Sequence, residues 1–219
     1  VRFRLSAPLF FNIKKNMCHF VSKSNLMNQK IIFSKPSLIP KILLKNSGPL
    51  SKQCISQGFK NFQEVSNYIQ YLPYGRIDKA TDLIDVLSEK KGTCSSKHAF
   101  LGKLADELNL NIKCVTGIYM MSKKNTPGIG NTLKINKLDA IPEAHCFLKY
   151  KQKYFDLTNS HSGKPLNFIQ IKLFSPNEIA ISKTDFHKSY ISNWAKKLDR
   201  NTKDIWKIRE NCIKSLIEN

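Results

Sequence analysis

The stretch Gly92-Thr93-Cys94-Ser95 is predicted to begin a helix, which places Cys94 in the first helical turn, and the interpretation of the rest of the chain depends on it. The first turn of a helix carries unpaired N–H groups and a partial positive charge, which favour a thiolate by roughly 0.3 to 2 kcal/mol. We therefore expect Cys94 to be a candidate nucleophile, with backbone N–H groups beside it that can hold an oxyanion. The helix itself is predicted over residues 95–108 because apolar residues recur at the spacing of one helical face, at Leu101, Leu104, Ala105 and Leu108.

A thiol nucleophile needs a base, and the downstream sequence offers one on a rigid element. Apolar and β-branched runs predict a buried strand over residues 112–121 and a β-hairpin over residues 144–151 and 154–158. A hairpin turn with an even number of residues would place His145 and Asp156 on the same face, within hydrogen-bonding reach. His145 is therefore the candidate base, and Asp156 is the candidate residue that orients it.

Helices are predicted on either side of these strands. The apolar spacing indicates one helix over residues 62–72, which Pro73 ends, and another from about residue 78 to residue 91. Two closing helices are expected over residues 186–198 and 204–217. Residues 122–140 exceed the length of an ordinary connection, so we expect a long loop there that is either functional or mobile.

The size of the chain limits the number of domains. Its 219 residues, of which 41% are apolar, suffice for one domain with a short extension but not for two full domains. Residues 1–57 are basic, are interrupted by prolines and sustain no helical or strand period. We therefore expect a poorly ordered N-terminal extension over residues 1–57 and one folded domain over residues 58–219.

The formal net charge of +20 raises the question of a polyanionic partner. Eleven basic residues and no acidic one fall between Val1 and Gln63, whereas the rest of the chain is only moderately basic. Such uneven charge, in a chain rich in Lys, Asn and Ile, is also typical of an AT-rich genome, so we do not expect a nucleic acid partner. The sequence carries no signal for an oligomeric state.

Cysteine usage and hydropathy bear on the location of the protein. The six cysteines lack the dense, regular spacing of a disulfide-stapled scaffold, which favours reduced thiols and a cytoplasmic setting. No apolar run approaches the roughly 18 to 20 residues that cross a bilayer, so no membrane span is expected. The basic, acid-free N-terminal segment is also typical of an organellar transit peptide, which leaves an organelle as the alternative location.

Three motifs, in their order and spacing, resemble the transglutaminase-like superfamily. They are Gly92-Thr93-Cys94 at a helix start, Ala144-His145 followed by Phe147, and Tyr154-Phe155-Asp156-Leu157-Thr158. The similarity covers about residues 74–160 and is closest to a group of uncharacterised, single-domain bacterial members. The resemblance implies an α+β, papain-like fold, in which the cysteine-bearing helix packs on an antiparallel sheet that carries the histidine and the acid.

The superfamily includes amidases, peptidases, transamidating enzymes and catalytically inactive proteins. The resemblance therefore implies a hydrolase or acyltransferase that acts on an amide bond of a peptide or protein, with water or an amine as acceptor and no cofactor. The alternative is an inactive peptide- or protein-binding module of the same fold. Departures from the family pattern keep this alternative open, because Thr93 and Ser95 stand where acidic residues are frequent and Phe147 stands where Trp is usual.

Residues that precede the cysteine helix or flank the histidine could assist the chemistry. Gln70 and Tyr74 are candidate oxyanion donors by their placement, although surface or packing roles fit them equally well. Strand alternation points Glu143 the same way as His145, so it could tune the site or be a solvated carboxylate.

His98, one turn after Cys94, raises the alternative of a zinc site together with His145, Cys146 and His161. Structural zinc sites generally contain ligand pairs at short spacing, such as Cys-x2-Cys, and this chain has no such pair. We therefore expect no metal, and we expect His98 to be packed or hydrogen-bonded.

Overall fold

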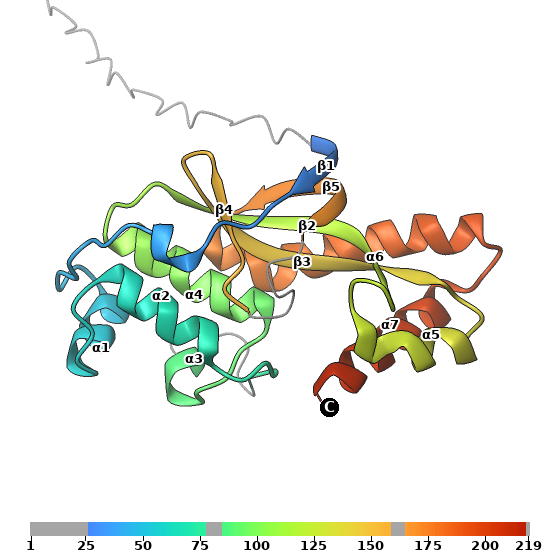
Figure 1. Cartoon of the computed structure of the whole chain (residues 1–219), viewed down its shortest axis with the longest axis horizontal. Coiled ribbons are helices and arrows are strands. Elements are labelled where there is room, and N and C mark those ends of the chain that lie inside the picture. Colours follow the sequence, from blue (N-terminus) through green and yellow to red (C-terminus); the bar gives the residue numbers. More distant parts are fainter. Residues whose placement is uncertain (1–25, 78–84, 159–164, 218–219) are drawn as a thin grey trace, which may run out of the picture.

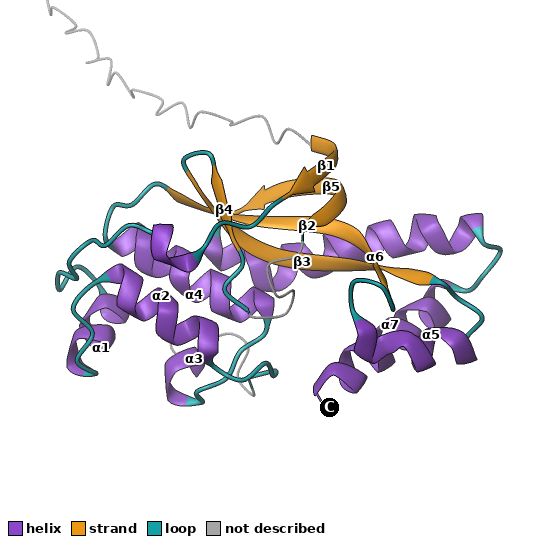
Figure 2. Ribbon diagram, viewed as in Figure 1, coloured by secondary structure: helices purple, strands orange, loops and turns teal. Residues whose placement is uncertain are grey.

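The computed structural model describes residues 26–77, 85–158 and 165–217. Helices surround one antiparallel sheet, so the fold is of the predicted α+β class (Figures 1 and 2). The elements follow one another in the order β1 (Leu26–Ile31), η1 (Pro36–Leu38), α1 (Pro49–Ser56), α2 (Phe62–Tyr71), α3 (Asp85–Ser88), α4 (Cys94–Glu107), β2 (Ile112–Ser122), η2 (Pro127–Ile129), α5 (Gly130–Ile135), β3 (Ala140–Tyr150), β4 (Lys153–Phe155), β5 (Leu166–Phe174), η3 (Pro176–Glu178), α6 (Ile179–Lys197) and α7 (Thr202–Ile217), where η marks a 3-10 helix.

The five strands of the sheet lie in the order β1-β5-β2-β3-β4, and each neighbouring pair is antiparallel. β2 and β3 pair along their full length, from Ile112 opposite Tyr150 to Ser122 opposite Ala140. The strand and the hairpin predicted from the apolar runs are confirmed. The two strands at the other edge, β1 and β5, were not predicted.

Alternating side chains of β2 and β3 divide the interior into two cores. On one face, Cys114, Cys146 and Leu148 pack with residues of α1, α2, α3 and α4. On the other face, Val115 and Phe147 pack with residues of α5, α6 and α7. Figure 1 shows α1 to α4 gathered at one end of the sheet and α5 and α7 at the other. The two helical groups therefore meet the sheet from different sides.

The cysteine helix α4 lies unusually close to β2. A Cβ atom added at Gly102 would stand 2.3 Å from the Cys114 sulfur, so only glycine permits this approach. The helix predicted over residues 95–108 is confirmed as Cys94–Glu107. Its N-terminus is thereby held against the central strands.

The expected extension over residues 1–57 is wrong for residues 26–57. β1 pairs with β5, and the Glu107 carboxylate of α4 accepts hydrogen bonds from the backbone N–H groups of Leu50 (3.1 Å) and Ser51 (2.7 Å) at the start of α1. Cys54 of α1 is fully buried. These contacts join residues far apart in sequence, so local periodicity carries no sign of them. Residues 1–25 lie outside the described part of the chain.

The predicted loop over residues 122–140 contains two short helices, η2 and α5. Ile129 and Leu133 are buried in the second core, and α7 packs against both helices. The loop prediction is wrong because a helix of six residues is too short to establish a period. The two closing helices are confirmed, although α6 begins earlier than predicted. Of the helix expected over residues 78–91, residues 78–84 lie outside the described residues.

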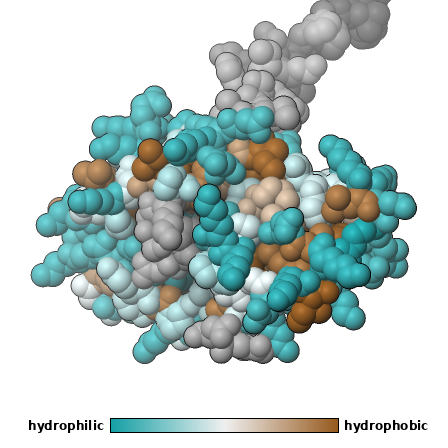
Figure 3. All heavy atoms as spheres, turned by 45° about the vertical axis from the view of Figure 1, so that its right-hand side comes forward, coloured by the Kyte–Doolittle hydropathy of each residue, from teal (hydrophilic) through white to brown (hydrophobic). Residues whose placement is uncertain are grey.

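The surface in view in Figure 3 is mostly hydrophilic, and the larger apolar areas lie on the right-hand half of that view. Among the described residues, no helix has both the length and the apolar character needed to cross a bilayer.

Candidate active site

Cys94 is the first residue of α4 and is almost fully buried. Thr93 caps the helix: its side chain accepts a hydrogen bond from the Ser96 N–H (3.4 Å), and the Ser96 hydroxyl accepts one from the Thr93 N–H (2.9 Å). The Lys97 N–H donates to the Thr93 carbonyl at 3.0 Å. The Cys94 N–H precedes these bonded groups and points out of the helix end, where it can meet an oxyanion.

The β3–β4 hairpin aligns the candidate base with the candidate acid. Its ladder runs from Leu148 opposite Phe155 to Tyr150 opposite Lys153, so the turn has two residues, as the predicted geometry required. Asp156 follows β4 on the diagonal from His145. The His145 Nε2 and Asp156 Oδ2 atoms are 2.9 Å apart, which is a hydrogen bond.

Asp156 is itself held in place by Thr158. Its second oxygen, Oδ1, accepts hydrogen bonds from the Thr158 N–H (3.1 Å) and the Thr158 hydroxyl (2.5 Å). Burial opposes the positive charge of His145, but the Asp156 carboxylate and the contact with Cys94 outweigh it and raise the pKa of His145 to about 10. The imidazole is therefore protonated at neutral pH.

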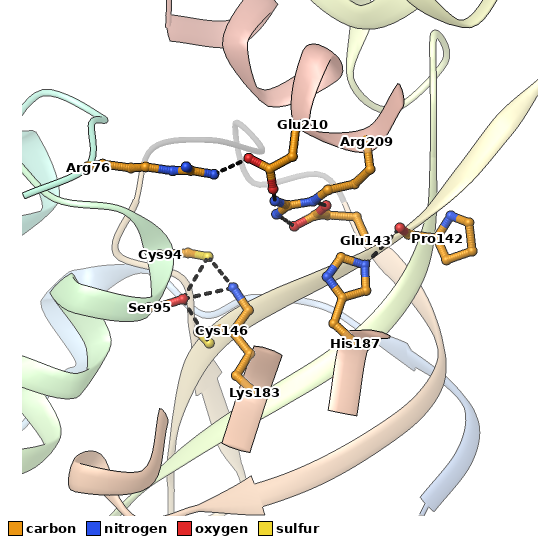
Figure 4. Close-up of polar contacts among 10 residues, drawn as sticks. All are labelled: Arg76, Cys94, Ser95, Pro142, Glu143, Cys146, Lys183, His187, Arg209 and Glu210. Carbon is orange, nitrogen blue, oxygen red and sulfur yellow. Dashed lines mark hydrogen bonds and ion pairs between the residues drawn. The ribbon is translucent and has the colours of Figure 1, made fainter. Parts of the chain in front are cut away.

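Several hydrogen-bond donors converge on the Cys94 sulfur. The ammonium of Lys183 lies 3.5 Å from it (Figure 4). The Cys146 thiol, His145 and Tyr74 also donate to it. The Cys146 hydrogen bond and the Lys183 and His145 charges outweigh burial, so the pKa of Cys94 falls well below its ordinary value. Because Nε2 of the imidazole is bonded to the carboxylate, the nitrogen that faces the sulfur is Nδ1.

The two candidate oxyanion donors differ in their placement. Tyr74 lines the cavity that contains Cys94 and hydrogen-bonds to its sulfur, so its hydroxyl lies beside the candidate nucleophile. The described residues that line the cavity do not include Gln70. The backbone carbonyl of Gln70 accepts a hydrogen bond from the Lys97 ammonium.

Lys97 is a fully buried lysine that the sequence interpretation missed. Its ammonium donates to the carbonyls of Leu72 (2.5 Å) and Gln70 (3.3 Å) at the end of α2, and burial lowers its pKa to about 8. The sequence did indicate this buried position, because Lys97 lies four residues before Leu101 and therefore on the inward, apolar face of α4. A charged residue at a core-facing position indicates a buried polar contact.

His98 bridges α4 and the segment that follows Asp156. Its Nδ1 lies 2.8 Å from the Cys94 carbonyl, and its Nε2 accepts a hydrogen bond from the Leu157 N–H at 3.0 Å. Burial lowers the pKa of His98 to about 4, so the ring is neutral. Both ring nitrogens are thus used in fixing the distance between the nucleophile and the acid.

The alternative of a zinc site finds no further support. Within the described ranges, no three His, Cys, Asp or Glu side chains are grouped so that they could hold a metal ion. His161 lies outside those ranges.

The remaining described cysteines are inert by comparison. Burial raises the pKa of both Cys54 and Cys114 to about 12 and that of Cys212 to about 11. Cys146 was predicted to be a packing residue only, and this prediction is incomplete because its thiol also contacts Cys94. No disulfide links these residues in the described part of the chain.

A cavity of about 330 Å³ opens beside the Cys94 sulfur. Apolar and aromatic side chains from the segment after α2, from β2 and from α7 form about half of its wall, and polar side chains form the rest. Its lining residues are Leu72, Tyr74, Cys94, Tyr119, Met121, Thr126, Glu143, His145, Thr158, Ile213 and Leu216. The cavity suits a chain whose reacting carbonyl is flanked by apolar groups.

Glu143 is the only carboxylate among the described residues of the cavity wall, and it is paired. Arg209 of α7 donates to both its oxygens at 2.6 Å, and Arg209 in turn contacts Glu210, which pairs with Arg76 (Figure 4). Burial opposes the charge on Glu143, but the guanidinium outweighs it and lowers the pKa of the carboxyl. The alternative of a solvated carboxylate is wrong. This network ties α7 to β3 beside His145.

Comparison with known proteins gives limited information. No family model and no curated protein matches the chain. One crystal structure, described as that of "a Putative Cysteine Protease from Cytophaga hutchinsonii", aligns with 68% of this chain and 58% of its own, with 14% sequence identity and a TM-score of 0.35. The chain thus spans less than two thirds of that protein. A similarity this low carries no argument about the site.

Proposed function

We propose that this protein is a thiol hydrolase or acyltransferase of the transglutaminase-like, papain-like type, with Cys94 as nucleophile, His145 as acid and base, and Asp156 as the orienting residue. One observation carries the proposal: the 2.9 Å hydrogen bond between His145 and Asp156 lies beside a cysteine at a helix start. A nucleophile, a base in contact with it and a group that orients the base are the parts that covalent acyl transfer requires.

The reaction would begin with a thiolate and an imidazolium. The Cys94 sulfur attacks the carbonyl carbon of an amide, and the Cys94 N–H and the Tyr74 hydroxyl stabilise the oxyanion. His145 gives its proton to the departing amine as the C–N bond breaks, which leaves a thioester. Neutral His145 then takes a proton from water or an amine as that acceptor attacks, and the thiolate departs.

The cavity supports a peptide or protein amide as substrate. Its apolar wall would hold a side chain next to the scissile carbonyl, and its carboxylate is already neutralised by Arg209. No charged substrate group is therefore required beside the sulfur. Water and an amine are both compatible acceptors, so hydrolysis and transamidation are the two forms of the proposed activity.

The proposal is tested by trapping the acyl-enzyme. The purified protein is mixed with p-nitrophenyl acetate, p-nitrophenol release is followed, and the acetylated residue is identified by peptide mass spectrometry. We expect a burst of p-nitrophenol and one acetyl group on Cys94, both lost in Cys94→Ala and both retained in the matched variant Cys114→Ala. A burst that survives Cys94→Ala would contradict the proposal.

A further inference from the structure

A second cation approaches the Cys94 sulfur from the long helix α6. The Lys183 ammonium lies 3.5 Å from the Cys94 sulfur and 2.8 Å from the Ser95 hydroxyl, and the lysine is almost fully buried (Figure 4). The described residues that line the cavity include Cys94 and His145 but not Lys183. Lys183 therefore reaches the sulfur without occupying the space open to a substrate.

Two of the other buried cations near the site have carboxylate partners, whereas Lys97 donates to the backbone carbonyls of Leu72 and Gln70. His145 is paired with Asp156, and Arg209 is paired with Glu143. In the described part of the chain, no carboxylate forms an ion pair with Lys183. A buried ammonium needs a counter-charge, because burial of an isolated ion is costly. The group in contact with Lys183 that can supply one is the thiolate of Cys94.

The charges around this pair come from several elements. β3 contributes His145, Cys146 and Glu143, α7 contributes Arg209, and Tyr74 approaches from the segment after α2. Burial disfavours the ammonium, but the charge of Cys94 outweighs it and raises the pKa of Lys183. The lysine thus stays charged over the whole range in which the thiol and the imidazole titrate.

We propose that Lys183 is a catalytic residue whose ammonium keeps Cys94 ionised independently of His145. This inference rests on the proposed function, because it assigns a role in generating the same nucleophile. Its consequence is a nucleophile with two cationic partners of different kinds. His145 can lose its proton to a leaving group, whereas Lys183 retains its charge throughout the cycle.

A permanent charge beside the sulfur also bears on release of the product. When water or an amine adds to the thioester, the resulting intermediate must break its C–S bond and return the electron pair to sulfur. At that stage His145 carries the proton taken from the acceptor, and Lys183 stands within 3.5 Å of the sulfur that receives the charge. Both cations stabilise the departing thiolate, so Lys183 favours resolution of the acyl-enzyme.

The test measures the pH dependence of iodoacetamide alkylation at Cys94, read by peptide mass spectrometry without any substrate. The variants are Lys183→Met, Lys183→Arg and His145→Ala, with Lys188→Met as matched control, because Lys188 is an exposed lysine of the same helix. We expect Lys183→Met to move the midpoint of alkylation upward by about one to three pH units, as loss of an opposite charge at this distance does. Lys183→Arg and Lys188→Met should each leave it near that of the wild type.

The variants separate the two proposals. We expect His145→Ala to retain a midpoint below that of an ordinary thiol, and addition of Lys183→Met to raise that midpoint further. A wild-type midpoint that is low but unchanged in Lys183→Met, or an equal shift in Lys188→Met, would overturn the role of Lys183 alone. An ordinary midpoint in the wild type would overturn the proposed function as well. Should Lys183→Met not fold, Lys183→Gln removes the charge while keeping an N–H donor.

Discussion

Replacement of Asp156 by Asn should lower the pKa of His145 by several units while the hydrogen-bond geometry is nearly kept. Opposite charges 2.9 Å apart attract by about 6 kcal/mol at an effective dielectric constant of 20. The difference between the ordinary pKa of 6.5 and the value of about 10 corresponds to about 5 kcal/mol. Burial, which lowers the pKa, offsets the rest. Without the carboxylate, only the contact with Cys94 opposes the effect of burial, so the imidazole should titrate well below 10.

The assay is an NMR titration of the His145 ring, which needs no substrate. The Cε1–H signal is assigned by its loss in His145→Gln and followed across the pH range in the wild type, in Asp156→Asn and in the matched control Asp139→Asn, whose carboxylate is exposed. We expect a midpoint near 10 in the wild type and in the control. A midpoint that stays near 10 in Asp156→Asn would refute the reasoning.

The raised pKa of His145 also predicts how the effect of Asp156→Asn on stability should change with pH. A raised pKa means that the folded state binds the proton more tightly than the unfolded state, so the stabilisation is complete below about pH 6.5 and is lost as the pH rises through about 10. The free energy of urea unfolding should therefore differ most between the wild type and Asp156→Asn near pH 6, and the difference should shrink towards pH 10. A difference that grows with pH would contradict the assignment.

Three further substitutions test other parts of the site. Tyr74→Phe removes a hydroxyl that donates to Cys94 and should lower kcat/KM about 10²- to 10³-fold with an unchanged melting temperature; an unchanged kcat/KM would exclude Tyr74 as oxyanion donor. Arg209→Met leaves Glu143 buried without its partner and should cost about 3 to 5 kcal/mol in urea unfolding, most of which Glu143→Gln should restore. Gly102→Ala forces a methyl group against a thiol of β2 and should cost about 1 to 3 kcal/mol in the same assay; a neutral effect would show that α4 can move away from the sheet.

Periodicity predicted the elements that carry the proposed triad. The apolar stripe from Leu101 to Leu108 and the alternation through residues 144–158 are local patterns. In the folded chain, each corresponds to a buried face of its helix or strands. Local spacing made the His145–Asp156 contact conditional on a turn with an even number of residues, and the two-residue turn meets this condition. The site residues that lie on these elements were therefore accessible from sequence.

The residues that complete the environment of the sulfur were not predicted, because tertiary contacts place them there. Lys183 lies on α6, four residues before His187, which is buried and bonds to the Pro142 carbonyl at 2.9 Å. Its position on an inward face could have marked it, as for Lys97, but nothing local indicates which residue such a lysine meets. Arg209 is similar, since its partner is 66 positions away.

The predicted boundary between the N-terminal extension and the domain was wrong for a related reason. β1 is short and its sequence, LMNQKI, alternates poorly, so only its pairing with β5 makes it a strand. Pairing between segments about 140 residues apart leaves no trace in either segment alone. The boundary between extension and domain therefore depends on contacts that composition does not encode.

The most direct test of the central claim is the ionisation of Cys94 itself. The absorbance of thiolate at 240 nm is titrated in the wild type and in Cys94→Ala, and the difference between the two curves isolates this one thiol. The account predicts that the thiolate forms with a midpoint well below the ordinary value of a thiol. A difference that appears only near pH 8.5 to 9, where an unperturbed thiol ionises, would contradict it.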